Sequence, residues 1–225
     1  MALRDALSKK VYVERAFVWA VFLTLALVHL GAALQLNTKV PRNDDWSLVH
    51  SYLKWKDGNV NELVSPFNVH LVPRLKIILF GVWDLGGVSL TVTGILGAAV
   101  LVAGVGLGMV LLSSNLLKSR DVYLHATLPL LLMGIAPIDI VTWATGLGLV
   151  IFCAGSFLVL CLIASDLAER SRIAWFGLWL LLCILPFVNT LGIIFSVTVA
   201  IVLMLRVVLC GRDRPNKRLA ISIAV

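Results

Sequence analysis

The side chains of this chain that could do chemistry are concentrated in one polar stretch, from Leu36 to Leu75. Asp44 and Asp45 stand side by side in this stretch and are followed by Trp46. A carboxylate can act as a general base, and neighbouring carboxylates near a low-dielectric surface can have a raised pKa or hold a cation. The same residues can instead form a solvated turn or cap a helix over Trp46–Lys56. The sequence leaves the catalytic and the structural interpretation open.

A second polar group follows in the same stretch and suits an anionic ligand. Pro66 and Pro73 interrupt helices, so His70 between them is expected in a non-helical or kinked segment. Arginine contacts phosphate through paired hydrogen bonds and lysine acts as a point charge, so Arg74 and Lys76 could bind a phosphate. The plainer alternatives are a structural hydrogen bond for His70 and anchoring of the two basic side chains to anionic lipid headgroups.

The rest of the chain predicts a membrane scaffold for these residues. The chain is 60% hydrophobic and 14% charged, with a mean hydropathy of +0.99, whereas soluble domains have roughly 45–50% apolar and about 25% charged residues. The expected fold class is therefore an all-α, polytopic membrane protein that forms a single transmembrane domain over residues 1–225. The net charge of +7 is spread over short loops, which does not indicate nucleic-acid binding. The four cysteines form no Cys-x-x-Cys pair, so neither a zinc site nor a disulfide framework is indicated.

About six transmembrane helices are predicted from the long apolar runs. The last run, from Ile173 to Leu209, is too long for one crossing and is divided at Pro186. The alternative for this run is one long helix kinked at Pro186. The other four predicted spans are Ala16–Gln35, Val88–Leu112, Val122–Ile135 and Ile140–Ser165.

Basic residues predict the orientation of these spans. They recur in every short connection on the side of the N-terminus, whereas the short connections on the other side carry none. Residues 36–87 are therefore expected outside, with both ends of the chain in the cytoplasm. Leu75–Leu85 is apolar but too short to span, so we expect a helix lying at the outer interface. After the basic cluster Arg212–Arg218 the chain turns apolar again, which indicates either a truncated longer protein or a peripheral tail.

Four further residues of the apolar segments stand out. Asp139, between the third and fourth spans, faces the same compartment as the polar stretch; it either caps the fourth span or contributes to substrate binding. His29 is expected near the outer membrane boundary, where its ring can reach water. Gly104 and Gly108 form a Gly-x-x-x-Gly pair, which indicates close helix packing.

The order of these features resembles the amino-terminal half of the bacterial polytopic glycosyltransferases of the GT-C superfamily. The resemblance covers roughly residues 16 to 210, and its specific part is Asn43–Leu75, with Asp-Asp-Trp followed by Asn-x-His-x-x-x-Pro-Arg. It implies transfer of a sugar from a polyprenyl-phosphate carrier at the extracytoplasmic face of the inner (plasma) membrane. Where the related loops have Glu and Arg beside the histidine, this chain has Val69 and Leu71.

In this reading Asp44 or Asp45 is the catalytic base. The substrate-binding group comprises Trp46, His70, Arg74, Lys76 and Asp139. No metal ligand or cofactor is assigned, although the paired carboxylates could hold a divalent metal. The expected partners are a lipid-linked sugar donor, membrane lipids and a further membrane protein. The alternative is a non-catalytic polytopic protein that acts as an assembly or lipid-binding partner.

Overall fold

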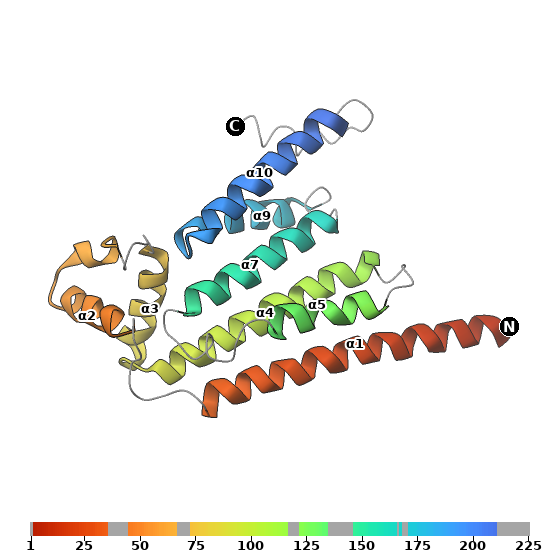
Figure 1. Cartoon of the computed structure of the whole chain (residues 1–225), viewed down its shortest axis with the longest axis horizontal. Coiled ribbons are helices and arrows are strands. Elements are labelled where there is room, and N and C mark those ends of the chain that lie inside the picture. Colours follow the sequence, from red (N-terminus) through yellow and green to blue (C-terminus); the bar gives the residue numbers. More distant parts are fainter. Residues whose placement is uncertain are drawn as a thin grey trace.

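The protein is helical in every regular element that the structure describes (Figure 1). The structure is a computed structural model, and it describes residues 2–35, 45–66, 73–116, 122–134, 146–165, 167 and 171–210. The helices in chain order are α1 Ala2–Gln35, α2 Asp45–Lys56, η1 Val60–Leu63, α3 Pro73–Gly86, α4 Leu90–Leu116, α5 Val122–Gly134, α7 Gly146–Ala164, α9 Arg172–Ile184, η2 Leu185–Phe187 and α10 Leu191–Cys210.

Three helices in the described part of the chain are long and apolar enough to cross a membrane: Tyr12–Gln35, Leu90–Leu112 and Gly146–Ala164. They correspond to the first, second and fourth predicted spans. Two apolar helices, Arg172–Phe187 and Leu191–Leu205, are shorter. Helix α5 has 13 residues with Pro129 inside it, and at about 1.5 Å per residue it is shorter than a hydrocarbon core of about 30 Å.

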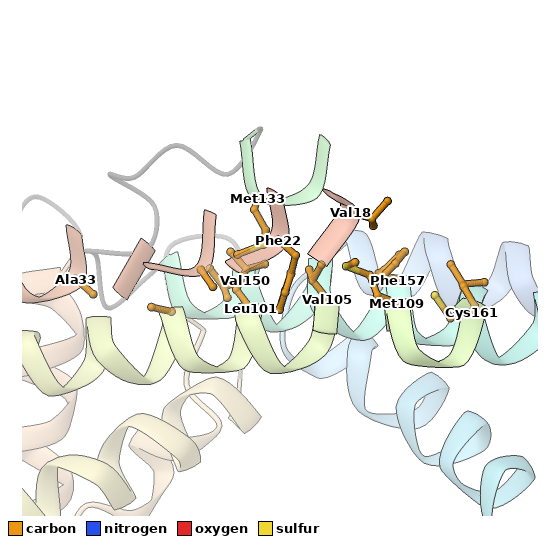
Figure 2. Packing of buried hydrophobic residues seen from close by; sticks show 13 residues of the cluster. Val18, Phe22, Ala33, Leu101, Val105, Met109, Met133, Val150, Phe157 and Cys161 are labelled. Carbon is orange, nitrogen blue, oxygen red and sulfur yellow. The ribbon is translucent and has the colours of Figure 1, made fainter. Parts of the chain in front are cut away.

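The long helices lie side by side and bury their shared apolar faces. In Figure 1, the axes of α1, α4, α5 and α7 are roughly parallel, although the chain runs in opposite directions along α1 and α4. Phe22 of α1, Leu101 and Val105 of α4, Met133 of α5 and Phe157 of α7 meet in one buried cluster (Figure 2). Without a hydrophobic drive between helices in lipid, such close side-chain packing is what holds spans together.

The predicted close packing at Gly104 and Gly108 is confirmed. A Cβ atom at Gly104 would lie 2.6 Å from the Cβ of Ala154, and one at Gly108 would lie 2.3 Å from Cε1 of Phe157. Both neighbours belong to α7. The two glycines therefore let α4 and α7 approach more closely than any larger residue would allow.

The predicted division at Pro186 is also confirmed, and the alternative of one kinked helix is wrong. Helix α9 ends at Ile184, the single turn η2 contains Pro186, and α10 runs back along α9. Ser196 Oγ of α10 donates a hydrogen bond to the carbonyl oxygen of Leu182 at 3.1 Å. The two helices form a hairpin because proline and the following turn stop the first helix, and their buried leucines and valines then pack together.

Gly192 lies against the backbone of Leu185 in this hairpin, and its replacement by alanine is expected to destabilise the protein. A Cβ atom there would lie 2.1 Å from the carbonyl oxygen of Leu185, which is backbone and cannot rotate away. Such overpacking costs about 1–3 kcal/mol. Gly177 of α9 is the matched control, because a Cβ there meets nothing within 4 Å and alanine favours helices. Thermal unfolding in detergent should show a lower midpoint for Gly192→Ala and an unchanged or raised midpoint for Gly177→Ala; equal midpoints would contradict this account.

Helices α2, η1 and α3 form a cap at one end of the bundle, and α3 runs across the direction of the long helices (Figure 1). Helix α3 begins at Pro73, whose fixed φ suits a first helical position. At 14 residues it is too short to cross a bilayer. The short helix predicted over Leu75–Leu85 is thus present, and its position at the membrane interface stays a prediction.

Candidate functional site

Asp45, one of the two candidate bases, is the first residue of α2 and is only 1% exposed. Leu48 and Tyr52 lie on the same face of α2, at helical spacings of three and seven, and are buried as well. A carboxylate at this position is favoured by the positive end of the helix dipole. Trp46 projects away from this face and is 56% exposed. The side chain of Asp45 therefore lies inside the cap, whereas the side chain of Trp46 lies on its surface.

An aromatic cluster beneath Asp45's helix joins α2 to α3. The ring of Tyr52 lies 5.5 Å from the rings of both Phe80 and Trp83, and these edge-on contacts are the favoured aromatic geometry. Trp83 Nε1 donates to Thr93 Oγ1 at 3.0 Å, and Thr93 Oγ1 donates to the carbonyl oxygen of Ser89 at 3.0 Å. The cluster thus fixes α2 on α3 and, through Trp83, fixes α3 on the first turn of α4.

Lys76 is fully buried, and its ammonium group donates hydrogen bonds to other parts of the protein. Its Nζ donates to the carbonyl oxygens of Glu62 and Ser65 at 2.8 and 2.9 Å and to Ser65 Oγ at 2.7 Å. A lysine ammonium has three N–H donors, so these contacts occupy all of them. Burial lowers the pKa of Lys76, and the negative charge of Glu62 partly opposes that shift. In this arrangement Lys76 holds the turn at η1 and has no donor left for a phosphate.

Glu62 is the acidic partner at the same turn. Its carboxylate accepts a hydrogen bond from Ser65 Oγ at 3.1 Å and lies 3.7 Å from Lys54 Nζ. Burial by itself would raise the pKa of Glu62, but hydrogen bonds from Ser51 and Ser65 and the charges of Lys54 and Lys76 bring it below its ordinary value. Because the folded pKa is lowered, this carboxylate favours the fold at neutral pH and loses that contribution as the pH falls through the lowered pKa.

Lys56 and Asp84 form an ion pair that ties the end of α2 to the end of α3. The hydrogen bond to Asp84 raises the pKa of Lys56. Both side chains are about half exposed, and water weakens such pairs, so the energetic contribution is small. The pair is one of several contacts between α2 and α3, beside the more buried aromatic cluster.

Arg74 attaches the cap to the hairpin formed by α9, η2 and α10. Its Nη1 donates to the carbonyl oxygen of Cys183 at 2.7 Å, and its guanidinium carbon lies 4.5 Å from the ring of Phe187. At the start of α7, a Cβ atom at Gly148 would lie 2.9 Å from the carbonyl oxygen of Val188 and 3.1 Å from Cδ2 of Leu75. A guanidinium has five N–H donors and this hydrogen bond uses one. Arg74 can therefore contact a phosphate while keeping this bond, which Lys76 cannot do.

Three of the predicted site residues, Asp44, His70 and Asp139, lie outside the described residues. Asp44 directly precedes α2, and His70 lies three residues before the start of α3. Within the described part of the chain, no group of three or more His, Cys, Asp or Glu side chains could hold a metal ion.

The side chain of His29 is only 2% exposed, so the prediction that its ring reaches water is wrong. Its Nδ1 lies 2.9 Å from the carbonyl oxygen of Leu25, one turn earlier in α1. A carbonyl only accepts, so Nδ1 is the donor in this contact.

The turn residues Glu62 and Ser65 were not predicted to interact with Lys76. The signal that could have indicated a buried partner is the position of Lys76 within the apolar run Leu75–Phe80. A lysine on the buried side of a short apolar helix needs acceptors close by.

Comparisons of this chain with protein families, with curated proteins and with solved structures found no match.

Proposed function

We propose that this protein is a membrane-embedded transferase of the GT-C type, which moves a sugar from a polyprenyl-phosphate carrier at the extracytoplasmic face. One observation supports this most: a carboxylate, Asp45, is held inside the polar cap at the first turn of a helix. A carboxylate held in such a position is a candidate general base. The residue before it, Asp44, is the second candidate base.

In the proposed reaction one of the two aspartates accepts the proton of the acceptor hydroxyl as that oxygen attacks the sugar. Arg74 binds the carrier phosphate at the point where the cap meets the hairpin, and His70, four residues earlier, contributes to the same site. Trp46, whose side chain is exposed on α2, contacts the sugar or the lipid in this proposal. Lys76 is left out of this group because its three donors are already used.

A non-catalytic role is the second candidate, and the contacts of the cap favour it. Lys76, Arg74 and the Lys56–Asp84 pair all bind partners within the chain. A rigid cap of this kind suits a docking surface for another membrane protein, and such a surface does not require a catalytic base. Sugar transfer measured in vesicles, with each aspartate replaced in turn, separates the two candidates.

The proposed topology has six spans, both ends in the cytoplasm and residues 36–87 outside. In intact cells, a membrane-impermeant thiol reagent is expected to label Asn59→Cys, in the exposed turn before η1, and to miss Asn216→Cys. The native cysteines are replaced first, and permeabilised cells serve as the control in which both positions react. Labelling of Asn216→Cys in intact cells would overturn this orientation.

A further inference from the structure

The corner between α3 and α4 exposes large apolar side chains beside a cap that is otherwise well packed. Leu85, near the end of α3, is 92% exposed, and Val88 after it is 43% exposed. The neighbouring Trp83 is fully buried. Gly87, with φ of 75°, lets the chain turn sharply between the two helices. The turn leaves Leu85 and Val88 pointing away from the protein.

These side chains directly precede, in sequence, a helix of membrane-spanning length that also exposes apolar side chains. Helix α4 exposes Val92, Leu107 and Val110, and its segment Leu90–Leu112 is long and apolar enough to cross a membrane. A lipid-facing stripe on such a helix starts where the hydrocarbon core starts. Leu85 and Val88 precede Leu90 by at most five residues, so they lie at the boundary between hydrocarbon and headgroups.

The polar groups next to the corner suit the same boundary. Asp84 directly precedes Leu85 and is paired with Lys56, and both side chains are about half exposed. Helix α3 itself runs across the direction of α4 (Figure 1), as a helix lying in the membrane surface does. An apolar tip beside a charged pair is the pattern of an interfacial anchor.

We infer that the corner formed by Leu85 and Val88 inserts into the outer surface of the bilayer, with lipid as its partner. The cap is fixed on α4 through Trp83 and Thr93, so this insertion sets the height of the whole cap above the membrane. The insertion depends on the exposed corner and not on sugar transfer, and it holds for a catalytic and a non-catalytic protein alike; that the surface is the outer one rests on the proposed topology.

Spin labels test this in the full chain, reconstituted in phosphatidylcholine vesicles after replacement of the native cysteines. Leu85→Cys carries the label, with Leu107→Cys as the lipid-facing control and Asn59→Cys as the control in the exposed turn of the cap. Oxygen concentrates in the bilayer, whereas a nickel chelate stays in water. The ratio of oxygen to nickel accessibility is expected to be highest at residue 107, intermediate at 85 and lowest at 59.

Two other results would overturn the inference. A label at residue 85 with the same ratio as residue 59 would place the corner in water. A label at residue 85 that is accessible to neither reagent would mean that a protein partner or a second copy covers the corner. Circular dichroism of each labelled variant verifies that the helices are intact.

Discussion

Replacement of the catalytic aspartate by asparagine is expected to lower the turnover of sugar transfer by about 10²–10⁴-fold. Asparagine keeps the size of the side chain and removes the proton acceptor. Since Asp44 and Asp45 are adjacent and only one can lie beside the acceptor hydroxyl, we expect one of the single variants to show this loss. Turnover is measured with a polyprenyl-phosphate sugar in vesicles that contain the purified protein.

The structure provides controls that separate catalysis from folding. Asp45 is buried, so Asp45→Asn could act through the stability of the cap, and its thermal midpoint is measured together with turnover. Asp57→Asn changes an exposed acid just after α2 and should leave turnover unchanged. If both Asp44→Asn and Asp45→Asn retain full transfer, the pair is not catalytic, and the non-catalytic role becomes the better account.

Arg74 should affect a different kinetic quantity in the same assay. Arg74→Ala removes a phosphate partner, so the KM for the carrier should rise more than kcat falls. Arg74→Lys keeps the charge but loses the planar fork, and an intermediate KM is expected. Because Arg74 also binds the carbonyl of Cys183, a thermal midpoint for each variant distinguishes weaker carrier binding from a loosened hairpin.

Much of the fold could be predicted because it follows from local physical chemistry. Unbroken apolar runs indicated the helices that became α1, α4 and α7, since a chain in lipid must satisfy its own backbone hydrogen bonds. Proline fixed two boundaries: Pro73 begins α3, and Pro186 ends the first arm of the hairpin. Helix α5 has 13 residues in the described part of the chain, and an apolar run of that length does not distinguish a span from a shorter packed helix.

The contacts of the polar side chains could not be predicted, because their partners are far away in sequence or are backbone atoms. Arg74 binds the carbonyl of Cys183, more than a hundred residues away. Every residue has a backbone carbonyl, so the residue type does not indicate which one will accept the hydrogen bond. Lys76 is similar, because two of its three acceptors are carbonyl oxygens. The sequence could show that these residues are basic and near the membrane, but not whether a ligand or the protein itself receives their hydrogen bonds.

Replacement of Lys76 by methionine is expected to lower the free energy of unfolding by about 1.5–3 kcal/mol, the net contribution of hydrogen bonds to a charged group. Methionine fills much of the same volume and removes a buried charge, which is favourable by itself. However, the carbonyl oxygens of Glu62 and Ser65 then lose the lysine donor at a half-buried position, and only the Glu62 carbonyl keeps a second donor, Ser65 Oγ; we expect that loss to outweigh the gain. Lys54→Met is the matched control: Lys54 is half exposed, 3.7 Å from the carboxylate of Glu62, and such a pair is worth about 0–1 kcal/mol. Denaturant titration in mixed micelles measures both variants, and limited proteolysis should show faster cleavage near η1 only for Lys76→Met.

In Lys76→Ala, added ethylammonium should restore part of the stability, because a small cation can re-enter the site formed by the same three oxygens. Equal effects of the two methionine variants, together with no recovery in ethylammonium, would mean that Lys76 does not hold the turn.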